Sequence, residues 1–351
     1  MAVARSTMLV VPPGWISELE RTGTFGPHEY LRAVERAYLY WGRGRGSLLR
    51  RQNLWVSARQ GKIDGSYFMR PGSAGSLKLL AAALPDAGIV GAVIYAAGFH
   101  LSGADVSVLL YHAQDGDLRA HVHGDTVFTA RKTGAVAAVA TKHLADPALA
   151  GGFSLGLVGA GNIALHAGEA IAMALPVRHI AVSGRAPERV AACARRLAAL
   201  APAHAVSVRD AVERSDVVVL ATTSRIPVIN GAWLKQGALV LAMGAHYPEA
   251  REVDDATVAR ARIVVDSREQ ALAEKGDLLV PLSTGVIRPS DVSEELGTVV
   301  ASRRPHAANG KDLTLFCSGG AAFEYLAVAD AIVAKIDGER RDRLDPRVEE
   351  R

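Results

Sequence analysis

The chain has 351 residues, 49% of them hydrophobic, and a formal net charge of +4 at pH 7. This composition is ordinary for a protein with a buried α/β core, and the length suffices for two domains of about 150 residues. Lysine and arginine form no dense stripe interleaved with aromatic residues, so nucleic-acid binding is not expected. The mild positive charge suits an anionic small molecule instead.

The sequence also argues against a membrane span, a disulfide framework and a metal site. Cys193 and Cys317 are too few for a disulfide framework, and a reducing cytoplasm is the default for such a chain. The apolar stretch 87–101 is shorter than a bilayer span, and the first apolar run is too short for a signal peptide. No carboxylates or thiols cluster with the histidines that suggest a metal, His112, His121 and His123.

The first 130 residues predict a mixed unit of helices and antiparallel strands. Residues 27–41 have the spacing of a helix with one apolar side, and residues 129–144 form an alanine-rich helical pattern at the end of this region. Between them lie five predicted strands separated by turns, at 53–57, 65–69, 89–96, 105–111 and 118–123.

The texture of the sequence changes at Phe153. From there to Val265 strands and helices alternate, which predicts right-handed βαβ units in a parallel sheet. After Lys311 the run LTLFCSGGAAFEYLAVADAIVAKI predicts a strand, a glycine turn and a helix that return to the first domain. Residues 341–351 are highly charged and predict a solvated tail.

A glycine turn follows the first strand of the alternating region. The apolar run 153–158 leads into the G-x-G-x-x-A sequence of residues 159–164, and a helix continues to Ala174. The first glycine makes a tight turn, the second lets the backbone approach a pyrophosphate, and the small third residue lets the helix pack on the strand. The pattern predicts a Rossmann-type site for NAD(P)(H). Its expected contacts are Gly159, Gly161, Asn162, Ile163 and Ala164.

The end of the second strand bears on the choice between NADP(H) and NAD(H). NAD sites usually carry Asp or Glu about 20 residues after the glycine turn. Here Ser183-Gly184-Arg185 stands at that place, and Arg189 follows one helical turn later. No carboxylate repels a 2′-phosphate and an arginine is present to bind one, so NADP(H) is favoured. The alternatives are that Arg185 is solvated at the helix start or stacks on adenine in an NAD enzyme.

Two threonines end the strand that begins at Ser215. Thr222 and Thr223 stand where the carboxyl end of a parallel strand borders the ligand crevice. They are expected to contact the cofactor, with capping of the next turn as the alternative role.

Five stretches resemble the ornithine cyclodeaminase / mu-crystallin family. They keep the family's order and spacing and span most of the chain after Thr129, whereas the first hundred residues match loosely. They are FTARKTGAVAAVATKHLA (128–145), LGLVGAGNIALHAGEAI (155–171), SDVVVLATTSRIPVINGAWLKQGALVLAMGAHYPEAREVD (215–254), EKGDLLVPLSTGVI (274–287), and EELGTVVASRRP with DLTLFCSGGAAFEYLAVADAIV (294–305 and 312–333).

The resemblance implies both an architecture and a chemistry. A Rossmann doubly wound parallel sheet (131–310) is inserted into an α+β substrate-binding and dimerisation domain (1–130 plus 311–340), and the protein is a homodimer. Members of the family transfer hydride between NAD(P) and the α-carbon of an amino acid or its imine. The expected partner is therefore a small imine or amino acid with a carboxylate.

The family's R-T-x-A motif is altered in the helix 129–144. The motif's arginine, which binds the substrate carboxylate, corresponds to Lys132, with Arg131 before it and Thr133, expected at the cofactor, after it. Lys132 can neutralise a carboxylate but lacks the bidentate fork of arginine. A shift of one residue along the helix would present Arg131 instead. The lysine that the family carries in a strand corresponds in our alignment to Val93.

Three further positions depart from the family's pattern or match it loosely. In the family's G-A-D-x-P turn His246 takes the place of the acidic residue. Histidine exchanges a proton near neutral pH but stabilises a cation less well than a carboxylate, so it favours imine reduction over ornithine cyclodeamination. Tyr325, after Glu324, replaces an aspartate that touches the substrate amine, and Arg51 corresponds loosely to an arginine that grips the carboxylate.

The sequence therefore predicts an NAD(P)H-dependent reductase of a small imine or α-imino acid, or the reverse amino-acid dehydrogenation. His246 and Lys132 are the expected catalytic residues, and the expected substrate contacts are Arg51, Arg131, Glu324 and Tyr325. One alternative is a cyclodeaminase or oxidative deaminating enzyme that recycles NAD+. Another is a non-catalytic NADPH-binding protein like mu-crystallin.

Overall fold

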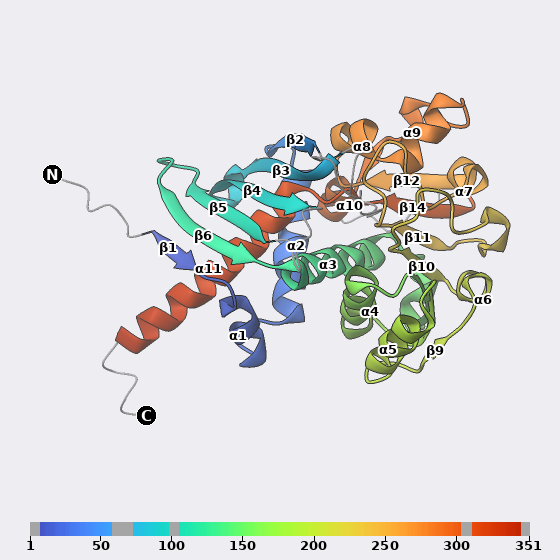
Figure 1. Ribbon diagram of the computed structural model, residues 1–351, viewed down its shortest axis with the longest axis horizontal. Coiled ribbons are helices and arrows are strands. Elements are labelled where there is room, and N and C mark those ends of the chain that lie inside the picture. Colours follow the sequence, from blue (N-terminus) through green and yellow to red (C-terminus); the bar gives the residue numbers. More distant parts are fainter. Residues whose placement is uncertain (1–7, 58–72, 98–104, 303–310, 345–351) are drawn as a thin grey trace. The chain divides into compact units, whose positions relative to one another are not determined.

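The computed structural model describes residues 8–57, 73–97, 105–302 and 311–344, which fall into two compact units (Figure 1). The first unit comprises Met1–Tyr40, Gly44–Thr129 and Ala322–Arg351. The second comprises Trp41–Arg43 and Ala130–Ala321. The helix α3 (Thr126–Leu144) begins in the first unit and continues in the second.

The first unit is built on a six-stranded sheet in the order β1-β6-β5-β4-β3-β2. Neighbouring strands are antiparallel, except that β1 runs parallel to β6. The strands are β1 (Leu9–Val11), β2 (Ser47–Ser57), β3 (Ser73–Leu84), β4 (Ile89–Ala97), β5 (Val106–His112) and β6 (Leu118–Gly124).

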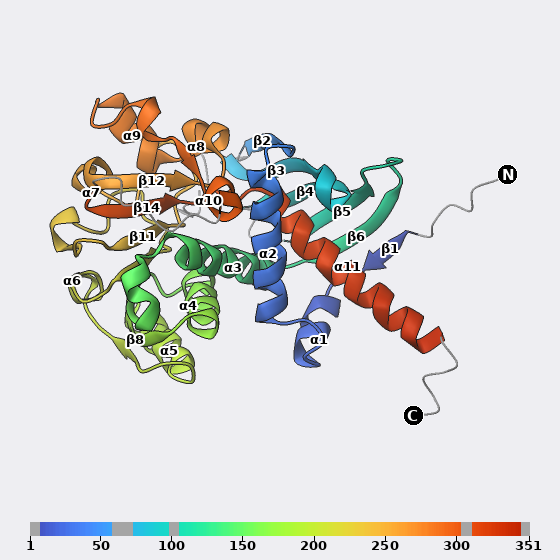
Figure 2. The same cartoon turned by 180° about the vertical axis from the view of Figure 1, so that it is seen from behind.

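One face of this sheet carries the core of the first unit. Alternate residues of the strands are buried, such as Leu80 on β3 and Val93 on β4. Figure 2 shows α2 (Pro27–Gly42) and α11 (Ala322–Leu344) together on that face, while α1 (Trp15–Arg21) follows β1 in the chain. The approach of α11 is close, because a Cβ added at Gly91 on β4 would lie 2.8 Å from Leu326 Cδ2.

The second unit holds an eight-stranded sheet in the order β13-β12-β14-β11-β10-β7-β8-β9, with every pair parallel. Its central strands are uninterrupted runs of buried residues, as expected for a parallel sheet covered on both faces. The strands are β7 (Phe153–Val158), β8 (Val177–Ser183), β9 (Ala203–Ala205), β10 (Val217–Leu220), β11 (Leu239–Ala242), β12 (Ala261–Val265), β13 (Glu294–Glu295) and β14 (Leu313–Cys317).

The order of these strands reverses between β7 and β10. The chain winds outward from β7 through β8 to β9, then returns to β10 on the other side of β7. In doubly wound sheets, ligands bind at this switch point, beyond the carboxyl ends of the strands. The connecting helices are α4 (Asn162–Ala174), α5 (Pro187–Leu197), α6 (Val208–Glu213), α7 (Asp255–Arg260), α8 (Arg268–Glu274), α9 (Gly276–Ser283) and α10 (Leu296–Ser302).

The structure confirms the predicted fold class, a doubly wound parallel sheet together with an α+β unit. The predicted domain boundary at residue 311 was wrong for β14, which pairs with β11 and β12 in the large parallel sheet. The return to the first unit comes at Ala322 instead, where α11 begins.

The predictions for two strands and for the charged tail also need correction or lie outside the described residues. Strand β3 was not predicted, because its run of leucine and alanine lacks the β-branched residues that mark strands. The predicted strand 65–69 lies outside the described residues. The charged tail was expected from residue 341, but α11 continues to Leu344.

None of the described helices combines the length and the apolar character that crossing a bilayer requires.

We expect Leu315→Ala, at the centre of β14, to lower the free energy of unfolding by about 2–5 kcal/mol. Leu315 is fully buried in the core of the parallel sheet, and the truncation leaves a cavity there. Equilibrium urea unfolding measures the effect. Leu200→Ala is the matched control, since Leu200 is 41% exposed, and it should change stability by less than about 0.5 kcal/mol. Equal losses in the two variants would contradict the placement of β14.

Candidate functional site

The turn after β7 brings two strand ends into direct contact. Gly159 has a φ of 121°, in the left-handed region that favours glycine. A Cβ added at Gly159 would lie 2.3 Å from the carbonyl oxygen of Ala221, which follows β10. The Gly159 amide also donates to the carbonyl of Ser183 at the end of β8, at 2.9 Å. The first glycine of the turn therefore ties together the ends of β7, β8 and β10.

The rest of the turn presents backbone to open space. A Cβ added at Gly161 would meet no atom within 4 Å, and both Gly161 and Asn162 are exposed. Helix α4 starts at Asn162, and Ala164 is fully buried within it. The first N–H groups of a helix carry a partial positive charge and bind anions, so this cradle fits a dinucleotide pyrophosphate.

An arginine that follows β8 contacts a threonine that follows β10. The Arg185 guanidinium donates a hydrogen bond to Thr223 Oγ1 at 3.2 Å, and both residues are exposed. Arg189 on α5 and Gly184 are exposed as well. Ser183 behaves differently, because its side chain is fully buried and its hydroxyl donates to the Leu157 carbonyl at 3.0 Å. Its contribution to the site is therefore to the shape of the turn.

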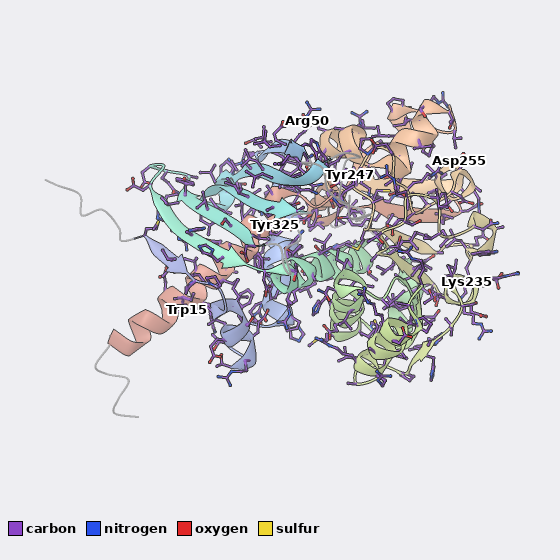
Figure 3. All side chains as sticks on the ribbon, in the orientation of Figure 1. Trp15, Arg50, Lys235, Tyr247, Asp255 and Tyr325 are labelled. Atoms are coloured by element: carbon purple, nitrogen blue, oxygen red, sulfur yellow. The ribbon has the colours of Figure 1, made fainter. Side chains whose placement is uncertain are left out.

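His246 lies in the loop that follows β11. Its Nδ1 is 3.2 Å from the Gly244 carbonyl oxygen, which requires Nδ1 to carry the proton and donate it. The ring lies beside Tyr247, labelled in Figure 3, with centroids 4.5 Å apart. In this tautomer Nε2 is the nitrogen that accepts a proton.

Three buried charged residues support the same strand ends, and the sequence did not predict them. Glu252, Lys275 and Asp277 are all fully buried. Glu252 accepts hydrogen bonds from Thr222, after β10, and from Gly244 and Ala245, after β11. A buried charge is retained where it is paired and hydrogen-bonded, but the charged neighbours of these residues, such as Arg251 before Glu252, provided no sequence signal of burial.

The residues predicted on α3 differ in burial. Lys132 is 1% exposed, whereas Arg131 and Thr133 are half-buried. A Cβ added at Gly134, two residues later, would lie 2.4 Å from the His166 carbonyl oxygen on α4. The helix therefore packs directly against α4, with Lys132 on its buried side.

In the first unit the buried lysine of the sheet is Lys78, not a residue of β4. Val93, which our alignment matched to the family's strand lysine, is a fully buried core residue. Among the described strands of this sheet the single lysine is Lys78 on β3, which is 1% exposed. It lies across from Tyr95 on β4, with Nζ 5.7 Å from the ring centroid. Its signal was a lysine within the otherwise apolar run SLKLLAAAL.

The start of α11 carries the two other residues predicted in this unit. Glu324 is fully buried and accepts a hydrogen bond from Tyr38 on α2 at 2.7 Å. Tyr325, labelled in Figure 3, is 5% exposed, and its hydroxyl is 3.5 Å from Thr129 Oγ1. Its ring centroid is 6.0 Å from that of Phe128. Tyr325 thus packs within the aromatic part of the first unit.

Arg51 lies on the edge strand β2. The pairing of β2 with β3 is irregular between Leu49 and Gln52, so Arg50 and Arg51 lie at a bulge. Arg51 is half-buried, while Arg50, labelled in Figure 3, is exposed. Across the described residues, no group of three histidine, cysteine, aspartate or glutamate side chains could hold a metal ion.

The parallel sheet, its switch point and the open glycine cradle define a dinucleotide-binding protein of the Rossmann type. The sequence profile of the ornithine cyclodeaminase/mu-crystallin family matches residues 104–340. The chain belongs to this family.

Curated relatives and solved structures agree with this assignment. The chain is 34% identical to ketimine reductase mu-crystallin of Mus musculus over 229 residues, which are 64% of this chain and 68% of that protein. It is 33% identical to delta(1)-pyrroline-2-carboxylate reductase of Paracoccus denitrificans over 236 residues, 66% of this chain and 73% of that protein.

Similar solved structures that contain a nicotinamide cofactor match nearly the whole chain, among them these two. One is Thermococcus litoralis delta(1)-pyrroline-2-carboxylate reductase in complex with NADH and L-proline, with a TM-score of 0.80, 27% identity, and coverage of 95% of this chain and 98% of that one. The other is the iminosuccinate reductase of Paracoccus denitrificans in complex with NAD+, with a TM-score of 0.80, 26% identity, and coverage of 95% and 97%.

We expect Gly159→Ala to weaken nucleotide binding by more than tenfold, about 1.4 kcal/mol. The new methyl group would meet the Ala221 carbonyl and force the ends of β7 and β10 apart. Isothermal titration with NADPH and NADH measures the effect. Gly116→Ala is the control, because Gly116 has a φ of 78° but open space around it. If both variants bind nucleotide like the unchanged protein, the turn is not the binding cradle.

Proposed function

We propose that this protein is an NAD(P)H-dependent reductase of a small imine that carries a carboxylate, or catalyses the reverse dehydrogenation of the amino acid. The observation that carries the proposal is the position of the His246 imidazole. It lies in the loop after β11, and β11 belongs to the same sheet as β7, whose following turn forms the dinucleotide cradle. Relatives and solved structures named as ketimine, pyrroline-2-carboxylate and iminosuccinate reductases support the reaction class.

The dinucleotide, when bound, supplies the hydride that reduces the C=N carbon. The chain's own groups hold it: the backbone of Gly159 and Gly161 and the first turn of α4 at the pyrophosphate, with Thr222 beside them at the end of β10. Placement and electrostatic stabilisation then supply most of the rate.

NADP(H) is the preferred cofactor in our proposal. The support is the exposed Arg185, which follows β8 at the place where an NAD site would carry an acidic residue and donates a hydrogen bond to Thr223, after β10. A guanidinium and a hydroxyl at this place suit the 2′-phosphate of NADP(H). NAD(H) is the alternative, since the similar structures carry NADH and NAD+.

We expect Arg185→Ala to weaken NADPH binding about tenfold while changing NADH binding less than about twofold, because one charge-assisted hydrogen bond contributes about 1.5–3 kcal/mol. Fluorescence titration with both nucleotides measures the ratio. Arg225→Ala is the control, since Arg225 is an exposed arginine of the same unit. Equal effects on the two nucleotides would show that Arg185 does not read the 2′-phosphate.

His246 moves the proton in this proposal. Reduction adds a hydride to the imine carbon and leaves the nitrogen with one more bond to hydrogen. The Gly244 carbonyl fixes the His246 tautomer, so Nε2 exchanges the proton with the substrate nitrogen. Lys132 neutralises the carboxylate, with Arg131 of the same helix as the alternative cation.

The direct test is a spectrophotometric screen of NADPH and NADH with cyclic and acyclic imino acids. We expect turnover of at least one, and His246→Gln should lower kcat by about 10²-fold with little change in NADPH affinity. His204→Gln, in an exposed part of β9, is the control. Tight NADPH binding without turnover of any imine or amino acid would contradict the proposal and favour a non-catalytic binding protein.

We propose that the protein is a homodimer formed through the face of the six-stranded sheet that none of the described helices of the first unit covers. On that face an apolar row crosses the paired strands, with His121 as its one polar member. The row is Val10, His121, Leu109, Ala92, Ala81 and Leu49. Leu54 and Leu77 extend it and are 64% and 39% exposed. An apolar patch of this kind marks an interaction site, and a second copy offers the same surface.

The cytoplasm is the location that we propose. Both cysteines of the chain are free and buried, and burial raises the pKa of Cys193 to about 11. Such thiols are inert structural residues, which suits a reducing compartment.

A further inference from the structure

Glu252 is a fully buried carboxylate that joins two strand ends. Its Oε1 accepts hydrogen bonds from the Thr222 backbone N–H at 2.7 Å and from the Thr222 hydroxyl at 2.8 Å. Its Oε2 accepts from the backbone N–H groups of Gly244 at 2.6 Å and Ala245 at 3.3 Å. One oxygen therefore serves the end of β10, and the other serves the end of β11.

The two strand ends also touch each other. A Cβ added at Gly244 would lie 2.3 Å from the Thr222 carbonyl oxygen and 2.6 Å from Glu252 Oε1. No side chain fits there, so the backbone of the two ends and the carboxylate form one packed cluster. His246 follows two residues after Gly244 and donates to the Gly244 carbonyl, which makes its position depend on this cluster.

Lys275 and Asp277 provide the charges around Glu252. Lys275 Nζ is 3.3 Å from Asp277 Oδ2, and it donates to the carbonyl of Ala245 and to that of Ser318, which follows β14, at 3.1 Å. Asp277 Oδ1 accepts from the backbone N–H of Glu252 at 2.6 Å. The lysine thus anchors the loop after β11 to the end of β14, and the aspartate fixes the backbone of Glu252.

Ionised Glu252 satisfies these hydrogen bonds best. A carboxylate accepts all four bonds, whereas a protonated carboxyl must also place its own O–H, and of the four partner groups only the Thr222 hydroxyl can accept it. Burial and the neighbouring Asp277 raise the pKa of Glu252 to about 7, against the effect of the Thr222 donors and Lys275. Cys317 is a further titratable group of this charged cluster. Acidification should therefore weaken the hydrogen bonds that tie Glu252 to the two strand ends.

We infer that Glu252 is the positioning residue of the nicotinamide side of the crevice: its carboxylate sets the ends of β10 and β11 and thereby places Thr222 and His246. Arg185 lies on the β8 side of the glycine turn, so the adenine half of the cofactor binds there. The nicotinamide half therefore lies over β10 and β11. Glu252 acts through its neighbours, because it is fully buried and presents no surface to a ligand. The inference rests on the proposed function, which it extends to a residue outside the crevice surface.

The test uses the full chain and reads the two halves of the cofactor separately. Binding of 2′,5′-ADP, or of ADP if the protein prefers NAD(H), reports the adenine side. The enhancement of reduced-nicotinamide fluorescence on binding reports the other side. We expect Glu252→Gln to bind the adenine probe within about twofold of the unchanged protein. The same variant should bind the reduced dinucleotide about tenfold more weakly, a factor equal to about 1.4 kcal/mol, and lose most of the enhancement.

The matched control is Asp254→Asn, two residues along the same loop. Asp254 caps α7 through Thr257 and also accepts from the Gly231 N–H, so it stabilises the loop without touching the ends of β10 or β11. This variant should keep both signals. If Asp254→Asn loses the enhancement as fully as Glu252→Gln, the effect is general loop destabilisation and the inference is overturned.

The pH dependence separates positioning from a merely structural role, and it holds even if Glu252→Gln fails to fold. The enhancement should be full above about pH 7 and fall as the pH drops through it, because protonation of Glu252 weakens its hydrogen bonds to the two strand ends. Thr222→Val removes one donor to the carboxylate, so the midpoint should move to higher pH. Thr298→Val, at an exposed threonine of α10, should leave it unchanged.

An unmoved midpoint in Thr222→Val, or an unchanged enhancement in Glu252→Gln, would overturn the inference. Both readouts are of binding and need no turnover. Failure of the imine screen therefore leaves them interpretable, and the two proposals stand or fall separately.

Discussion

The fold of the second unit depends on one close approach, between the Gly159 turn and the carbonyl of Ala221. Gly159 has a φ of 121°, and a Cβ added there would lie 2.3 Å from the carbonyl oxygen of Ala221, so the position accepts no side chain. This contact fixes where β7 ends relative to β10, and it leaves the N-terminus of α4 facing open space. The switch point, the anion cradle and the threonines after β10 all follow from it.

The two ends of the crevice are built from different physical interactions. At the adenine end the residues are exposed, and one hydrogen bond between Arg185 and Thr223 organises them. At the other end a buried carboxylate and its charged neighbours hold the backbone from behind. A surface arginine can be exchanged at small cost to stability, whereas breaking a buried charged network is expensive. Cofactor preference can therefore vary within this architecture more freely than the geometry at His246.

The sequence predicted the parts of the molecule that local pattern determines. The glycine turn, its flanking strand and helix, and the alternating strands lie close together in the chain, so periodicity and spacing were sufficient. The role of Glu252 was missed because its partner Thr222 is 30 residues away and its charge suggests a surface residue. Lys78 was missed because β3 lacks β-branched residues, and β14 was assigned to the wrong unit because strand order is a long-range property.

The place of β14 has a consequence for how this chain is made. β14 lies between β11 and β12 in the sheet, yet it is the last of the described strands in the sequence. While the protein is being synthesised, β11 and β12 are complete long before Leu313 leaves the ribosome, and neither has its neighbour. Two inner edges of an apolar parallel sheet stay open during that interval, and open edges invite pairing with other chains. The nascent polypeptide is therefore most vulnerable to aggregation just before its final strand emerges.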